Sequence, residues 1–267
     1  MDDHDDHDGH TEFKKNLHQA IQRGWIREID HVVKEANDVG CDIMKLRYSL
    51  GMGTEDTDVS VLMLGIMESH DAKVIQCLLR NGADVTYGTP GGLTPLHLLA
   101  MANVPVFKRP FILDTAREFI TLGANVDALH NAKTPIFYAL RTPEMVRLLI
   151  EAGCDVHYRI TGPSNIDMTL LMYAAQTGHP ESVHLLIKAG ADLDLKDNRG
   201  WTAVDWARFA ENVGATKVLE EAIWYRDSHL MFALGNHAKN GNESLIRLLH
   251  SDAIDEILDK LIKSHSV

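Results

Sequence analysis

The chain has 267 residues, 45% of them hydrophobic and 24% charged, and these proportions are typical of a folded soluble protein and exclude a disordered chain. The formal net charge of −12 disfavours nucleic acid as a partner, because nucleic-acid-binding proteins gain most of their affinity from a basic surface; a local basic patch stays compatible with this charge. The apolar runs are shorter than the roughly 20 residues that span a membrane. Three widely spaced cysteines predict neither a disulfide framework nor a zinc site.

Residues 1–12 form an acidic, histidine-rich stretch, which predicts a disordered tail. The stretch lacks the basic start and apolar centre of a signal peptide, so we expect an intracellular, cytoplasmic protein. Its histidines, His4, His7 and His10, lie among five aspartates, and imidazole and carboxylate groups suit a divalent cation. Their spacing lacks the fixed geometry of a metal site, so a solvated tail is the favoured interpretation.

Two sequence patterns recur along the rest of the chain. The first is glycine, a small residue, Asp or Asn, and an aliphatic residue, and its five copies begin at Gly40, Gly82, Gly123, Gly153 and Gly190. Bulky apolar pairs such as Leu78-Leu79 precede it, which predicts a helix that ends at a glycine with a left-handed backbone. The second pattern begins at Thr94, Thr134, Thr169 and Thr202, with a degenerate copy at 61–64, and successive copies are 33, 40, 35 and 33 residues apart. Thr suits a helix cap, and the Pro that follows two of these threonines suits a first helical turn.

Because these motifs recur in register over about residues 57–222, the chain resembles the ankyrin-repeat family, whose unit of about 33 residues carries a Thr-Pro-Leu-His signature. The resemblance implies an all-α solenoid of stacked helix-turn-helix units with β-hairpin fingers. Divergent units at 17–33 and 234–249 bring the expected number to about seven, within a repeat domain at 13–250. Residues 251–267 are expected to hold a capping helix and a tail. The apolar side of that helix, predicted over 252–263, consists of Ile254, Ile257, Leu258, Leu261 and Ile262.

Three insertions interrupt the regular spacing. The stretch 101–114 is apolar, and Val106, Phe107, Phe111 and Ile112 either form an exposed binding loop or fold back to extend the core. Between Ile43 and Val61, the sequence predicts a finger of about twice the usual length. A smaller insertion occupies residues 157–168.

The resemblance also implies that partners bind through the fingers and through the concave surface of the first helices. The corresponding positions are Tyr87, Leu93, Met101, His130, Lys133, Arg141, Tyr158, Arg159, Gln176, Lys196, Arg199, Trp201 and Phe209. They are rich in aromatic and basic side chains, which dominate interface energies and suit an acidic or extended segment of another protein. Alternatively, Trp201 and Phe209 pack between repeats and the finger residues only face solvent. Trp206, inside a helix, is expected in the core.

Other residues invite a catalytic interpretation that their position disfavours. His97, in the signature, is similar to a histidine that joins adjacent ankyrin repeats by hydrogen bonds. Cys77, with His70 and Asp71, suggests a thiol nucleophile, but it occupies an apolar position of a second helix, where a thiol is inert. The glycine-rich stretch 88–92 lacks the Lys-Ser/Thr of a phosphate loop and predicts a finger turn.

We therefore expect a non-catalytic protein-interaction module, a scaffold, adaptor or inhibitor, that needs no cofactor or metal. The alternative is an enzyme or metal-dependent protein that uses the amino-terminal tail or the long finger near Tyr48, with repeats for substrate recruitment. Catalysis needs side chains held in a fixed arrangement, and these two segments are the least constrained parts of the chain, which disfavours the enzyme alternative. A third interpretation, again from the family, is a substrate of an asparagine or aspartate hydroxylase. The corresponding positions, Thr86, Asp127, His157 and Asp194, lack the usual Asn.

Overall fold

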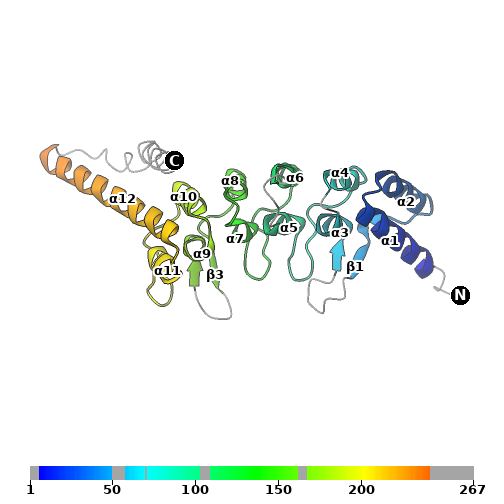
Figure 1. Cartoon of the computed structure of the whole chain (residues 1–267), viewed down its shortest axis with the longest axis horizontal. Coiled ribbons are helices and arrows are strands. Elements are labelled where there is room, and N and C mark those ends of the chain that lie inside the picture. Colours follow the sequence, from blue (N-terminus) through cyan, green and yellow to red (C-terminus); the bar gives the residue numbers. More distant parts are fainter. Residues whose placement is uncertain (1–5, 50–57, 70, 103–108, 162–166, 241–267) are drawn as a thin grey trace. The chain divides into compact units, whose positions relative to one another are not determined.

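The computed structural model describes residues 6–49, 58–69, 71–102, 109–161 and 167–240 (Figure 1). These residues form twelve α-helices, one short 3-10 helix and two antiparallel hairpins. The chain divides into two units: unit 1 comprises residues 1–139 and 144–155, and unit 2 comprises residues 140–143 and 156–267. Within the described ranges, no helix is both long and apolar enough to cross a membrane.

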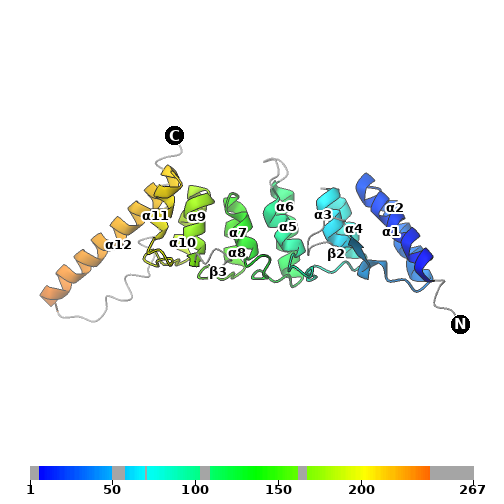
Figure 2. The same ribbon diagram turned by 90° about the horizontal axis from the view of Figure 1, so that it is seen from below.

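Unit 1 is built from four helix pairs. The first helices of the pairs are α1 (Asp6–Arg23), α3 (Val61–Glu68), α5 (Pro95–Met101) and α7 (Pro135–Ala139). The second helices are α2 (Ile26–Asp38), α4 (Ala72–Arg80), α6 (Arg109–Thr121) and α8 (Pro143–Glu151). Each first helix contacts the next first helix along the unit, and the second helices form a parallel row beside them (Figures 1 and 2).

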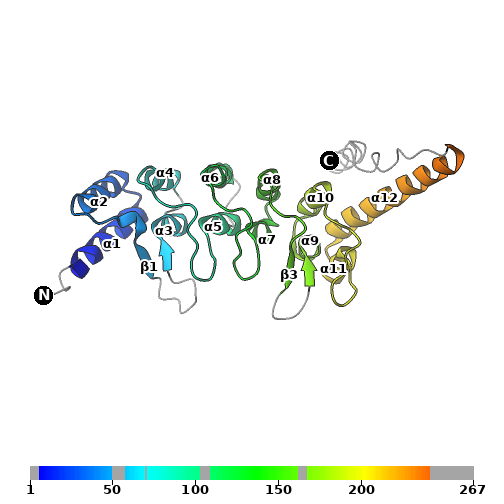
Figure 3. The same ribbon diagram turned by 180° about the vertical axis from the view of Figure 1, so that it is seen from behind.

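Unit 2 contains two more helix pairs and a hairpin (Figure 3). The helices are α9 (Leu170–Thr177), α10 (Pro180–Lys188), α11 (Ala203–Phe209) and α12 (Val213–Asn240). The hairpin joins β3 (Arg159–Thr161) to β4 (Asp167–Thr169), with Ile160 opposite Met168. Helix α11 packs against α9, and α12 packs against α10 and α11.

The glycine pattern ends helices as the sequence predicts. At Gly82, φ is +87°, its N–H donates to the Leu79 carbonyl at 3.0 Å, and the N–H of Ala83 donates to the Leu78 carbonyl at 3.0 Å. This pair of hydrogen bonds satisfies carbonyls that the end of the helix leaves without a partner. The same pair recurs at Gly40, Gly123, Gly153 and Gly190.

The threonine pattern begins helices, also as predicted. The Thr169 hydroxyl accepts a hydrogen bond from the Met172 N–H at 3.1 Å, which caps α9. In the degenerate copy, Ser60 takes the place of Thr, and its hydroxyl accepts from the Met63 N–H at 3.3 Å to cap α3. At Ser60, Thr94 and Thr169, a side-chain oxygen thus satisfies a backbone donor of the first helical turn.

The core of each unit lies between its first and second helices. Leu62, Leu96 and Phe119 of unit 1 and Leu171 and Leu186 of unit 2 are almost completely buried. Because apolar burial is satisfied between the helices, the connecting fingers are left at the surface, where side chains are available for other roles.

The two ends of the chain differ in part from the prediction. The first divergent unit is confirmed as the pair α1 and α2, with Leu17 and Ile29 fully buried. Helix α1 begins at Asp6, so a disordered tail over all of residues 1–12 was wrong. An acidic stretch is compatible with a helix start because the helix dipole favours negative charge there.

At the other end, residues 234–238, predicted to open a seventh unit, continue the 28-residue helix α12. The described part of the chain therefore contains six helix pairs. Residues 241–249 and the predicted helix at 252–263 lie outside the described residues. No proline falls between residues 213 and 240, and Gly235, the one glycine after the first turn of α12, costs a helix only about 1 kcal/mol, so nothing local ends α12 at that point.

The insertions form extended fingers and a longer helix. Between Ile43 and Val61, a 3-10 helix η1 (Ile43–Lys45) precedes a hairpin of β1 (Arg47–Ser49) and β2 (Asp58–Ser60), while residues 50–57 lie outside the described ranges. The insertion at 157–168 contains the β3–β4 hairpin. In the 101–114 insertion, Ile112 is buried in α6 and Phe111 is half-buried, in agreement with the core interpretation. Val106 and Phe107 fall outside the described residues.

Candidate protein-interaction surface

An arginine in the first finger of unit 1 stacks on a tyrosine in the next finger. The guanidinium of Arg47 lies over the Tyr87 ring, 3.8 Å from its centre, and the Tyr87 hydroxyl donates to the Asp58 carbonyl at 2.9 Å. Both side chains are half-buried. The stacking fixes two large side chains before any partner arrives, so a partner would meet little entropic cost in ordering them. The sequence identified Tyr87 but missed Arg47, whose only signal was its place in the long finger.

The next finger of unit 1 rests on a buried histidine network. His97 is fully buried, and its ring nitrogens lie 2.8 Å from the Thr94 hydroxyl oxygen and 3.3 Å from the Lys133 carbonyl oxygen. His130 Nδ1 lies 3.1 Å from the Gly91 carbonyl oxygen, so the two histidines join successive fingers. These contacts confirm the prediction that His97 is a structural hydrogen-bonding residue.

Two of the predicted contact residues lie inside these fingers. His130 is 7% exposed and Leu93 is 8% exposed, because each side chain packs into its own finger. Their side chains pack beneath the finger surface and leave little accessible area for a partner to contact. Lys133 stays half-buried, with its ammonium 5.9 Å from the centre of the Tyr138 ring. Tyr138 follows the signature in sequence and was not predicted.

In unit 2, one carboxylate organises the last finger. Asp197 is 6% exposed, and its Oδ1 accepts hydrogen bonds from the N–H groups of Arg199 at 2.9 Å and Trp201 at 2.8 Å. Its Oδ2 accepts from the Trp206 indole N–H at 3.1 Å. The carboxylate thereby holds the turn at Gly200 and the indole of α11 in one arrangement. The sequence motifs did not indicate a role for Asp197.

Trp201, Trp206 and Phe209 form what we call the unit 2 aromatic cluster. The ring centres are 5.2 Å apart for Trp201 and Trp206, 5.2 Å for Trp201 and Phe209, and 5.9 Å for Trp206 and Phe209. Trp206 is buried, as predicted, and Trp201 is half-buried, but Phe209 is 63% exposed. The alternative that Phe209 packs between repeats is therefore wrong. Edge-to-face contacts of Trp206 with Trp201 and Phe209 hold the cluster together, while Phe209 meets solvent.

Arg159 connects the β3–β4 hairpin to this finger. Its guanidinium donates to the Asp167 carboxylate at 2.8 Å and to the Lys196 carbonyl at 3.0 Å. The side chain is half-buried and its donors are partly used within unit 2. Arg159 thus positions the finger more than it offers free donors to a partner.

The remaining predicted contact residues are at least partly accessible. Met101 of unit 1 and Arg141, Lys196 and Arg199 of unit 2 are exposed, and Tyr158 and Gln176 of unit 2 are half-buried. Arg199 also lies over the Trp206 ring, 5.9 Å from its centre, which places a cation beside the unit 2 aromatic cluster. Within each unit, basic and aromatic side chains gather on the fingers.

The cysteines lack the surroundings of a nucleophile. Cys77 is fully buried and donates to the Asp30 carboxylate at 3.1 Å; burial, and then this hydrogen bond, raise the pKa of its thiol to about 11. Burial, and then Asp127, raise the pKa of Cys154 to about 12, and burial also raises the pKa of Cys41. Since the thiolate is the reactive form, these thiols are inert near neutral pH.

Alkylation of the folded protein is therefore expected to depend steeply on pH. At pH 8 the Cys77 thiol should react at least about 100-fold more slowly than in urea, because each unit of raised pKa removes nine-tenths of the thiolate. The raised pKa also favours the folded state below pH 9, and this contribution should be lost as the pH rises from 9.0 to about 11. Iodoacetamide labelling followed by peptide mass spectrometry measures the reaction rate, and urea unfolding between pH 8 and 11 measures the change in stability. Equal rates in native and urea-treated protein at pH 8 would contradict the assignment.

Comparison with known proteins agrees with this architecture. Family models described as ankyrin repeats match residues 62–160 and 161–207, together more than half of the chain. A Danio rerio protein that bears the name of a palmitoyltransferase is 29% identical over 178 residues, 62% of this chain and 25% of the relative. A glycerophosphocholine phosphodiesterase of Schizosaccharomyces pombe is 31% identical over 198 residues, 72% of this chain and 16% of the relative. The chain thus spans a quarter or less of the length of these relatives.

A solved structure shows the same fold. It is the complex of a predatory endopeptidase from Bdellovibrio bacteriovorus with an immunity protein, and one of its chains aligns with a TM-score of 0.56 at 23% identity. The alignment covers 78% of this chain and 97% of the other. The matched family models, the recurring Thr-Pro and glycine patterns and the stacked helix pairs agree, and the chain belongs to the ankyrin-repeat family.

Proposed function

We propose that this chain is a non-catalytic module that binds a partner protein through its fingers and the concave face of its first helices, as a scaffold, adaptor or inhibitor. Ankyrin repeats are typically protein-binding modules. The structural neighbour from Bdellovibrio bacteriovorus is a complex of two proteins, which supports this class of function.

The unit 2 aromatic cluster is the observation on which the proposal rests. Phe209 is 63% exposed, yet it is held in place by Trp201 and Trp206, which Asp197 in turn fixes. An exposed but ordered aromatic group beside an arginine is typical of an interface hot spot, because its contact area costs little entropy on binding.

The charges on the fingers indicate the chemistry of the partner. Lys196 and Arg199 are exposed beside the cluster, and Arg141 is exposed elsewhere in unit 2, although the chain as a whole carries a net charge of −12. Basic groups on an acidic protein attract an acidic segment selectively, since the rest of the surface repels it. We therefore propose an acidic or extended segment of another protein as the partner.

The chemistry of the side chains supports a role without catalysis. The cysteines are buried with raised thiol pKa values, and the described residues contain no group of three or more His, Cys, Asp or Glu side chains that could hold a metal ion. His4 and the side chains of His7 and His10 lie outside what the structure describes. Replacing those three histidines with Ala should leave partner binding unchanged, and a loss would favour the metal-dependent alternative.

Removal of the exposed aromatic and basic groups should abolish tight binding. In a capture experiment followed by titration of the captured protein, we expect Trp201→Ala combined with Phe209→Ala to weaken the Kd by about 30-fold, the roughly 2 kcal/mol of a hot spot. Arg199→Ala should weaken it less, because its cation is accessible to water. Matched controls are Val39→Ala and Leu122→Ala, which remove apolar groups that are also largely exposed but lie away from the fingers. Equal affinity of the cluster variant and the controls would contradict the proposal.

A further inference from the structure

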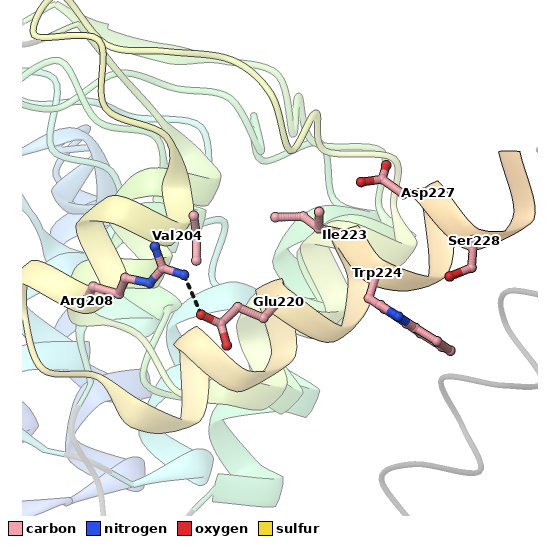
Figure 4. A pocket seen from close by; sticks show the side chains of 7 residues that line it. All are labelled: Val204, Arg208, Glu220, Ile223, Trp224, Asp227 and Ser228. Carbon is pink, nitrogen blue, oxygen red and sulfur yellow. Dashed lines mark hydrogen bonds and ion pairs between the residues drawn. The ribbon is translucent and has the colours of Figure 1, made fainter. Parts of the chain in front are cut away.

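A cleft opens between the last two described helices of unit 2 (Figure 4). It has a volume of about 500 Å³, and its lining residues are Val204, Arg208, Glu220, Ile223, Trp224, Asp227 and Ser228. Figure 4 shows Arg208 of α11 pointing to Glu220 of α12, and their ion pair of 2.6 Å bridges the two helices at one side of the cleft. The finger surface proposed above does not include any of these residues.

The cleft leaves apolar side chains exposed. Trp224 is 63% exposed, and Val204 and Ile223 are only half-buried. In an ankyrin stack, each helix pair normally covers the apolar side of the one before it, so a terminal pair needs a polar or covered outer face. The α11–α12 pair lacks a polar outer face because Trp224 and Ile223 lie on it. We therefore expect another segment to cover the cleft.

A segment of the same chain has the pattern that such a cover requires. Ile254, Ile257, Leu258, Leu261 and Ile262 recur at the spacing of one helical face. A helix of twelve residues is marginal in water by itself, because nucleation is costly and too few hydrogen bonds follow. The segment would gain its stability from apolar contact, and the cleft offers that contact.

The length of chain between the two allows them to meet. From Trp224 to Asn240 the helix α12 runs sixteen residues, about 24 Å at 1.5 Å per residue. The eleven residues 241–251 span up to about 36 Å when extended. The chain can therefore return along α12 and place residue 252 beside Trp224. A connection this short gives an effective concentration of about millimolar, so even a weak contact would be occupied.

We propose that residues 252–263 fold back onto this cleft and cover Val204, Ile223 and Trp224 with their apolar face. The rim also favours this occupant over a lipid surface: Glu220 and Asp227 border the cleft, and carboxylates repel anionic lipid headgroups. Residues 252–263 also carry charges of both signs, with Asp255 and Lys260 beside the apolar positions. These charges suit the rim of the cleft, which contains an arginine and two carboxylates. The chain thereby supplies its own terminal cap.

A reporter thiol in the cleft tests the proposal on the full chain. Ser228→Cys places a thiol at the rim, and the three native cysteines are buried, so at pH 7.5 the reporter should dominate labelling by a maleimide. Leu258→Asp together with Leu261→Asp removes the apolar face, and we expect the reporter to react about tenfold faster in that variant. Asp255→Ala with Asp259→Ala changes the polar side of the same segment and should leave the rate unchanged.

The other outcomes are also decisive. Asp192→Cys, an exposed position after α10, serves as a second reporter and should react at one rate in all backgrounds. A synthetic peptide of residues 252–263 should restore protection of Ser228→Cys in a chain that ends at residue 240. Equal Ser228→Cys rates with and without the apolar face would overturn the proposal, as would equal acceleration at both reporters. Protection that depends on protein concentration would mean that a second copy covers the cleft, and would also overturn it.

Discussion

Gly92→Ala is expected to destabilise unit 1 by about 4 kcal/mol, well beyond the usual cost of replacing a glycine. Gly92 has a φ of +84°, which costs alanine about 1 kcal/mol. A Cβ at this position would also lie 1.9 Å from the Leu129 carbonyl oxygen in the next finger. That oxygen belongs to the backbone, so the two fingers would have to separate, and the histidine contacts between them would be strained.

Gly82→Ala provides the matched control for this prediction. Gly82 has nearly the same φ, +87°, but a Cβ there meets nothing within 4 Å. Gly82→Ala should lower the free energy of unfolding by only about 1 kcal/mol, the cost of placing alanine at a positive φ. Thermal unfolding followed by circular dichroism should show Gly92→Ala lowering Tm by about 10 °C and Gly82→Ala by a few degrees. Equal losses would show that the close approach of the fingers is not a constraint.

The boundaries of the repeats could be predicted because their signals are local. A helix that ends at Gly82 or Gly190 does so through hydrogen bonds among neighbouring residues, and Thr169 caps α9 in the same way. Such features depend little on the rest of the fold. The length of α12 was missed because nothing local ends it, and tertiary packing decides how far a helix of this kind extends.

The surface was harder to predict because exposure depends on how one finger packs on the next. His130 and Leu93 occupy finger positions that commonly meet partners, but each packs inward here, so sequence position alone overstates their accessibility. Arg47 was missed because its partner, Tyr87, is forty positions away in the chain. Asp197 was missed because its three hydrogen bonds form only after the finger folds. Phe209 is exposed, and its role as a contact residue stays a prediction.

Asp197→Ala is expected to destabilise unit 2 by about 3 kcal/mol, because it leaves three N–H donors without their acceptor. Most of the loss should come from the Trp206 indole, whose hydrogen bond to Asp197 is buried. The backbone donors of Arg199 and Trp201 are less buried, so water can replace part of what they lose. The free energy of unfolding in urea, followed by tryptophan fluorescence, measures the change.

Asp197→Asn distinguishes the hydrogen bonds to the backbone N–H groups of Arg199 and Trp201 from the hydrogen bond to the Trp206 indole. The amide oxygen can still accept from Arg199 and Trp201, but the amide nitrogen then faces the Trp206 indole N–H, donor against donor, so about half of the loss should remain. Asp192→Ala is the control, because Asp192 accepts one exposed hydrogen bond from the Asp194 N–H at 2.8 Å and should cost less than about 1 kcal/mol. If Asp197 positions the unit 2 aromatic cluster for a partner, Asp197→Ala must also weaken partner binding while Asp192→Ala leaves it intact. A variant that loses stability but keeps full affinity would confine Asp197 to the fold and remove the link between the ordered finger and recognition.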